Sequence, residues 1–208
     1  MSNNEARRES VDAGLAIEIG EGFAGDGVNA AHINTVLGLR NGPVGAAFAT
    51  ALAQPTPGHV PFLAVWAPNV PVEPPTLFVN KATIAGDQHG NLTWGAAQAG
   101  VAAGVTAHVA EQVDVDRFDD ALLAQLVLIV AVWVNPSADD AALVFANNRD
   151  ATALALRRGG NAVAHDTTIA HDDVKVQSAL AAFRAGRTPH NPYFTPWQVR
   201  PRRRRTRW

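Results

Sequence analysis

Two basic side chains stand apart from the other charges of this chain. His32 lies in the segment GDGVNAAHINTVLGLR and Lys81 in TLFVNKATI, and Arg40 is the only other lysine or arginine between Arg8 and Arg117. Histidine gives and takes protons near neutral pH, while a lysine amine binds polar and anionic groups. Basic residues this isolated indicate a specific role in binding or catalysis.

The segments that carry these residues alternate apolar and polar positions, which is typical of β-strands. A strand over HINTVLGLR places His32 and Asn34 on one face, and a strand over TLFVNKATI places Lys81 and Thr83 on one face. The second strand thus presents an amine and a hydroxyl from one wall.

The rest of the chain predicts a mixed α/β (α+β) fold without internal repeats. A strand over LAIEIG ends in glycines 20, 22, 25 and 27, which we expect to form a mobile turn. FLAVWAP predicts a further β-rich segment, and LVLIVAVWV a strand buried on both faces. Helices are predicted over residues 43–53, 94–113 and 137–158, the last with Ser137 or Asp139 as its N-cap.

Three familiar kinds of site are poorly supported. The segment GEGFAG matches the dinucleotide fingerprint, but no helix follows it to bind a pyrophosphate. None of the four serines sits in a nucleophile elbow. The seven histidines are scattered without the one-turn spacing of a zinc site, so we expect no metal.

Composition bounds the class of protein. The 208 residues are 47% hydrophobic and 17% charged, which is enough for one globular domain with tails. The chain has no cysteine, and its first residues are polar rather than those of a secretory signal. The longest apolar run, residues 121–134, is shorter than the roughly 20 residues of a membrane span. We therefore expect a cytoplasmic protein with no membrane association.

The ends of the chain differ from its middle. Six of the 17 lysines and arginines lie in the last nine residues, which leaves 11 basic against 19 acidic residues elsewhere. We predict a disordered lead over residues 1–13, a domain over 14–160, a partly helical extension over 161–199 and an arginine-rich tail over 200–208. Nucleic-acid binding is not favoured, because no basic patch with interleaved aromatic residues precedes the tail.

Four longer blocks carry a resemblance to a known family. They are IGEGFAGDGVNAAHINTVLG, GPVGAAFATAL, GHVPFLAVWAPNVPVEPPTLFVNKATI and WGAAQAGVAAGV. Together they resemble successive blocks of the formaldehyde-activating enzymes of methylotrophic bacteria and methanogenic archaea. The blocks keep the family's order and nearly its spacing, over about residues 17–158.

The resemblance implies a fold, a reaction and a site. The fold is similar to the second domain of ribosomal protein S5, in a homopentamer. The reaction is the condensation of formaldehyde with tetrahydromethanopterin to 5,10-methylene-tetrahydromethanopterin and water, catalysed by a carbon-oxygen lyase with the pterin as co-substrate and no permanently bound cofactor. The family's general acid falls on His32, and its pterin-contacting positions fall on Asn34, Leu63, Lys81, Thr83 and Gln98.

One of these six positions departs from the family, because Asn34 stands where the family has aspartate. An asparagine cannot supply a negative charge beside the histidine. Two hypotheses therefore stand beside each other: a lyase that makes methylene-tetrahydromethanopterin, and a diverged homologue that binds formaldehyde or a pterin as a sensor, carrier or regulatory protein with little turnover. An enzyme that acts on another aldehyde or amine is a third.

Overall fold

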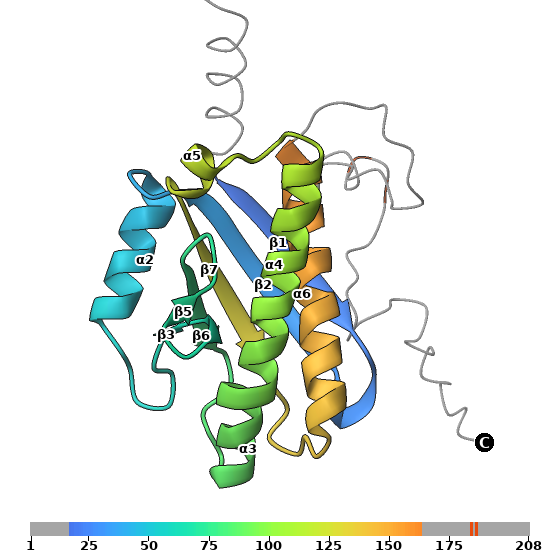
Figure 1. Cartoon of the computed structure of the whole chain (residues 1–208). Helices are drawn as coiled ribbons and strands as arrows, with labels where there is room; N and C mark the ends of the chain where they lie inside the picture. The colour runs from blue at the N-terminus through green and yellow to red at the C-terminus, as the bar shows by residue number, and fades with distance from the viewer. Residues whose placement is uncertain (1–16, 164–183, 185, 187–208) are drawn as a thin grey trace, which may run out of the picture. The chain divides into compact units, whose positions relative to one another are not determined.

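A five-stranded mixed sheet forms the centre of the protein (Figure 1). In this computed structural model, residues 17–163, Arg184 and Gly186 are described. The strand order is β1-β2-β7-β6-β3, in which only β6 and β7 run parallel. The five strands are β1 (Glu18–Ala24), β2 (Ala31–Leu39), β3 (Phe62–Leu63), β6 (Thr76–Asn80) and β7 (Leu126–Trp133).

Helices cover the two faces of this sheet unequally. The long helices α4 (Gln98–Asp114) and α6 (Ala141–Val163) lie side by side over one face (Figure 1). Helix α2 (Pro43–Ala53) contacts β2 and β7 from the other face. The remaining elements are short: η1 (Gly27–Asn29), β4 (Val65–Ala67), β5 (Val70–Pro71), α3 (Asp87–Asn91), the π-helix η2 (Leu92–Ala97) and α5 (Asp120–Leu123). The predicted mixed α/β fold is confirmed.

The main hydrophobic core lies between the sheet and the helices α4 and α6. Alternate residues of the strands, among them Ile33, Phe78 and Val130, are fully buried there against Val101 and Val105 of α4. Because side chains of a strand alternate between faces, the residues between these positions must point to the opposite face. That second face holds His32, Asn34 and Lys81.

The second face is only partly covered. Val44 of α2 is buried with Leu77 and Val127, outside the main core. Beyond α2 the face is open, and Ile19 of β1 is 65% exposed. On this face of β7, Ile129, Ala131 and Trp133 are only partly buried. The prediction that this strand is buried on both faces is therefore wrong for its second half.

The first strand also differs from its prediction. Gly20 and Gly22 lie within β1 rather than in a turn, and of these four glycines Gly25 and Gly27 have positive φ. A Cβ atom at Gly20 or Gly22 would stand within 2.0 Å of a backbone carbonyl oxygen of α6, because Ala155 O and Ala151 O would be at 1.8 and 1.9 Å. The glycines are needed for this close approach of helix to strand.

Helix α6 begins later than predicted. Two backbone N–H groups of its first turn, those of Ala142 and Leu143, donate to Asp140 Oδ1 at 2.9 and 3.0 Å. Asp140 therefore caps the helix, in place of the predicted Ser137 or Asp139. Asp139 instead accepts a hydrogen bond from the Asn29 amide at 2.9 Å.

The predicted lead over residues 1–13, the arginine-rich tail over 200–208 and nearly all of the extension over 161–199 lie outside the described residues. Among the helices that the structure does describe, none has the length and apolar character of a membrane span.

Candidate functional site

His32 is paired with a carboxylate on the neighbouring strand. Its Nε2 atom lies 2.6 Å from Glu21 Oε1. The side chain of His32 is 20% exposed and that of Glu21 is 55% exposed, so solvent reaches the pair. The antiparallel register brings them together, because Phe23 pairs with His32 and Glu21 pairs with Asn34 across β1 and β2. The Phe23 ring meets the imidazole edge to face at 6.3 Å between centroids.

Lys81 lies beside this pair on the same face of the sheet. Its Nζ atom donates to Asn34 Oδ1 at 2.7 Å, spanning β7 between the two strands. The backbone N–H of Lys81 donates to Val132 O at 2.7 Å, and this bond holds the backbone of Lys81 against β7. His32, Asn34, Lys81 and Glu21 thus form one cluster, which we call the open-face cluster.

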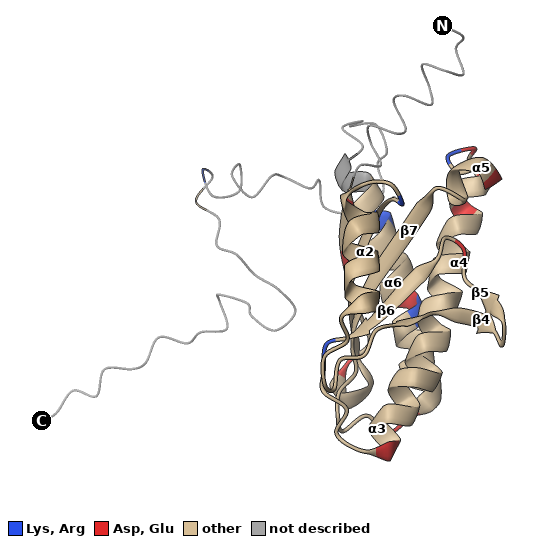
Figure 2. Ribbon diagram, turned by 90° about the vertical axis from the view of Figure 1, so that its left-hand side faces the viewer, with Lys and Arg blue, Asp and Glu red and all other residues tan. Residues whose placement is uncertain are grey.

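The amine of Lys81 is in an unusual setting for a lysine. Partial burial lowers its pKa, and the negative charge of Glu21 offsets part of that effect. The group that directly accepts from it, the Asn34 amide, is neutral. Few charged residues line the strands, and Figure 2 shows acidic residues instead at the ends of the helices α5 and α3.

The prediction that Thr83 and Lys81 lie on one strand is wrong. Strand β6 ends at Asn80, whose amide donates to Gly58 O at 2.7 Å and to Ala82 O at 2.8 Å and so turns the chain. The Thr83 hydroxyl lies 3.0 Å from His59 Nε2. His59 is held in turn through Nδ1, which lies 2.9 Å from Asn80 O.

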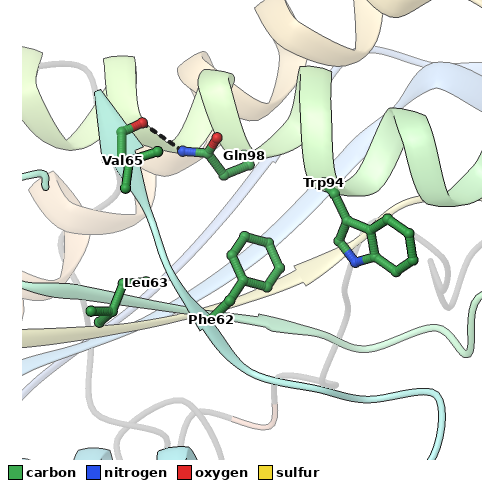
Figure 3. A pocket seen from close by; sticks show the side chains of 5 residues that line it. All are labelled: Phe62, Leu63, Val65, Trp94 and Gln98. Carbon is green, nitrogen blue, oxygen red and sulfur yellow. Dashed lines mark hydrogen bonds between the residues drawn. The ribbon is translucent and has the colours of Figure 1, made fainter. Parts of the chain in front are cut away.

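The last two predicted residues, Leu63 and Gln98, line a pocket of about 410 Å³ (Figure 3). The Gln98 amide donates to Val65 O at 2.7 Å, and its carbonyl oxygen points away from Val65 in Figure 3. The other walls are aromatic or aliphatic, which suits a planar ring. Phe62 and Trp94 are the aromatic residues, and Phe62 stacks on the buried Phe78 at 4.7 Å between centroids.

The six predicted residues therefore fall into separate places. His32, Asn34 and Lys81 lie on the open face, opposite the core residue Ile33. Gln98 belongs to α4, which covers the core face. Within one chain, the sheet stands between these two groups.

Several residues of these places were not predicted from the sequence, including Glu21, His59 and Trp94. Glu21 pairs with His32, His59 with Thr83, and Trp94 lines the pocket while 53% exposed. Glu21 had a detectable signal, because it alternates with Gly20 and Gly22 in a segment that continues the first strand. His59 and Trp94 are brought in by tertiary contacts alone.

The described residues contain no group of three or more histidine, aspartate or glutamate side chains placed to hold a metal ion. The chemistry that the open-face cluster itself offers is proton transfer by an imidazole and carboxylate, next to an amine of lowered pKa. That combination suits reactions between carbonyl compounds and amines.

This geometry defines a class: an α/β protein with a histidine–carboxylate pair and an amine on an open face of its sheet. The model of the formaldehyde-activating enzyme (Fae) family matches residues 19–181, and the chain belongs to that family. The match includes both the open-face cluster and the pocket.

Curated relatives agree with this assignment. The bifunctional enzyme Fae/Hps of Methanoculleus marisnigri is 35% identical over 175 residues, which are 84% of this chain and 44% of that protein. The protein of the same name from Methanospirillum hungatei is 34% identical with the same coverage of both chains. That of Methanosphaera stadtmanae is 39% identical over 141 residues, 68% of this chain and 34% of its own. The chain thus spans less than half the length of these relatives.

Proposed function

We propose that this protein condenses formaldehyde with tetrahydromethanopterin, giving 5,10-methylene-tetrahydromethanopterin and water, and that it is a carbon-oxygen lyase with His32 as general acid. The observation that carries the proposal is the His32–Glu21 pair, at 2.6 Å on an open face, in a chain of the formaldehyde-activating enzyme family. The pterin is a co-substrate that enters and leaves.

The reaction explains the need for an acid. Formaldehyde adds to a pterin amine as a carbinolamine, and hydroxide leaves that adduct slowly unless its oxygen is protonated. A protonated His32 donates this proton, while the Glu21 carboxylate stabilises the imidazolium before transfer. Glu21 thereby supplies the negative charge that Asn34 lacks. General acid catalysis of this kind contributes roughly 10²- to 10⁴-fold.

The other residues are proposed to bind the pterin. Gln98 has a carbonyl oxygen left to accept from the amide edge of the ring, and Leu63 packs on the ring's face. Lys81, Asn34 and Thr83 offer polar groups near the reacting amines. Holding the second pterin amine close to the iminium carbon adds a proximity effect.

A pterin that touches both His32 and Gln98 requires two copies of the chain, because the sheet separates these residues within one copy. We therefore propose a homo-oligomer, and the family resemblance implies a pentamer. Apolar side chains exposed near both places support a contact between copies: Ile19 is 65% exposed and Leu63 is 43% exposed.

The reaction is tested by following methylene-tetrahydromethanopterin formation at fixed formaldehyde and pterin, with and without the protein. The expected result is a rate well above the spontaneous one that falls roughly 10²-fold or more in His32→Gln. A rate equal to the spontaneous one would refute the proposed catalysis.

The two-copy site is tested with paired inactive variants. His32→Ala and Gln98→Ala are co-expressed, and the mixed oligomers are assayed beside each variant alone. Mixed oligomers should regain part of the activity, since some sites combine an intact Gln98 with an intact His32. If the mixture stays inactive while oligomers form, each site lies within one chain.

A second function is favoured by Asn34, the one departure from the family among the six positions. A diverged homologue that binds formaldehyde or a pterin as a sensor or carrier keeps the pocket and loses turnover. Calorimetric binding of tetrahydromethanopterin without acceleration of the condensation would select this function.

A further inference from the structure

Lys81 is held by a neutral partner. Its Nζ atom donates to Asn34 Oδ1 at 2.7 Å, and the amine is half-buried. An aspartate at position 34 would form an ion pair with the same geometry and hold the amine as an ammonium ion, which has no lone pair. Asparagine keeps the hydrogen bond and removes that charge.

The charged groups facing Lys81 are few. Glu21 is the acidic residue that acts on it, and Glu21 is itself engaged by His32 at 2.6 Å. Burial lowers the pKa of Lys81 more than Glu21 raises it. A lysine in these surroundings resembles those that act as nucleophiles toward carbonyl compounds.

We propose that Lys81 captures formaldehyde covalently, forming a methylene iminium on its Nζ atom with His32 as the proton donor. The inference rests on the proposed function for the identity of the aldehyde and for His32 as the acid. It assigns to Lys81 a catalytic role in place of a purely binding one, and ties that role to Asn34.

The step balances in two stages. The Nζ lone pair attacks the formaldehyde carbon, the carbonyl π electrons move to oxygen, and a proton shift from nitrogen to oxygen gives the carbinolamine. The nitrogen lone pair then expels the hydroxyl group, which takes the proton of the His32 imidazolium and leaves as water. The products are an Nζ=CH₂ iminium cation and neutral His32. An acceptor amine then attacks the iminium carbon to give an aminal, and a proton moves from the acceptor nitrogen to Nζ. The lone pair of the acceptor nitrogen expels Lys81 as a neutral amine and leaves the methylene group as an iminium on the acceptor.

The sequence provides an internal reference for the test. Lys81 and Lys175 are the only lysines of the chain, so the chain amino terminus is the only other alkylamine. The full chain is treated with limiting formaldehyde and sodium cyanoborohydride near neutral pH, which converts each iminium to an N-methyl group. Peptide mass spectrometry then measures methylation at each amine over time, in the absence of any pterin.

The expected result is that Lys81 is methylated several-fold faster than Lys175. Asn34→Asp should remove this advantage, because the new carboxylate pairs with the ammonium form. Asn91→Asp, an exposed change on α3 outside the open-face cluster, should leave it intact. Circular dichroism of each variant confirms that the fold is retained.

Equal methylation of Lys81 and Lys175, or an Asn34→Asp variant that labels like the parent chain, would overturn the inference. The outcome is separable from that of the proposed function. Condensation of the pterin without preferential Lys81 labelling leaves the lyase standing and refutes the covalent step. Preferential labelling without pterin condensation supports covalent capture and refutes the lyase.

Discussion

Two glutamates of β1, three residues apart, lie on opposite faces of the sheet and have opposite surroundings. Glu21 is exposed and pairs with His32 on the open face. Glu18 is 2% exposed and accepts a hydrogen bond from the Arg117 guanidinium on the core face. Strand alternation alone separates them, since an odd spacing reverses the face.

Each glutamate has a histidine and a basic side chain nearby, but the two groups differ in access. Burial raises the pKa of Glu18, and the charge of Arg117 offsets part of the rise. His108, in the same buried region, has neither ring nitrogen hydrogen-bonded within the described part of the chain. Its ring packs against Phe118 at 6.3 Å between centroids. We call Glu18, Arg117 and His108 the buried cluster.

Residue type alone does not distinguish a functional cluster from a structural one. Both clusters join an acid, a base and a histidine. Glu18 and His108 are buried, so we expect the buried cluster to act on stability, whereas solvent reaches the open-face cluster, to which we assign the proposed chemistry. Variants in each cluster should divide along the same line.

The largest expected effect is that of His32→Gln on the condensation rate. Loss of the general acid should lower the rate roughly 10²- to 10⁴-fold, while the free energy of unfolding changes by less than about 1 kcal/mol because the side chain is partly exposed. Initial rates and urea unfolding measure the two quantities. If the variant unfolds instead of losing activity, His32 has a structural role and the division between the two clusters is wrong.

Arg117→Ala should have the opposite signature. It leaves the buried Glu18 carboxylate without its partner, which should lower the free energy of unfolding by about 3 kcal/mol. The rate per folded molecule should be retained. Arg157→Ala is the matched control, since the Arg157–Glu111 pair is exposed and should contribute at most about 1 kcal/mol. Similar losses in both variants would contradict this view of the buried pair.

His108 should make stability depend on pH. Burial and the charges of Arg117 and Arg157 lower its pKa from 6.5 to about 4. Between these values the unfolded chain binds the proton and the folded chain does not, so the free energy of unfolding should fall as pH drops from about 6.5 to about 4, by about 3 kcal/mol in total.

The His108 contribution is isolated as the difference between the parent chain and His108→Leu, measured by urea unfolding at pH 7.5 and pH 4.5. The raised pKa of Glu18 acts with the opposite sign, and the difference cancels it. The variant should lose part of the pH dependence. Identical pH dependence in both proteins would show that burial does not lower the pKa of His108.

The smallest of these effects is expected for Glu21→Gln. A hydrogen bond to a charged group contributes about 1.5–3 kcal/mol, and the exposure of Glu21 favours the lower end, so the rate should fall roughly tenfold. Stability should stay within about 0.5 kcal/mol. An unchanged rate would show that Glu21 has no part in the proposed proton transfer.

Local patterns predicted a large part of this fold. Helix α2 spans residues 43–53 as expected, because Pro43 suits the first turn of a helix. Strand β2 begins one residue before its predicted start, and alternation put His32 and Asn34 on one face in agreement with the structure. The roles of the six site residues remain predictions.

What escaped prediction depends on contacts between distant segments. Strand β6 ends at Asn80, whose side-chain amide donates to the carbonyl oxygen of Gly58, a residue 22 positions earlier. The partner of His32 depends on the register of β1 against β2. Periodicity describes faces of single elements and contains no information on which faces meet.

The glycines of β1 have a consequence for how variants of this family should be interpreted. Gly20 and Gly22 lie on the core face against the backbone of α6, and they flank Glu21 on the strand. A methyl group at either position would displace β1, the strand that carries the Glu21 carboxylate. We expect this displacement to change the proposed acid catalysis before it unfolds the protein. Positions with no side chain can thus set the chemistry of a site that they never touch.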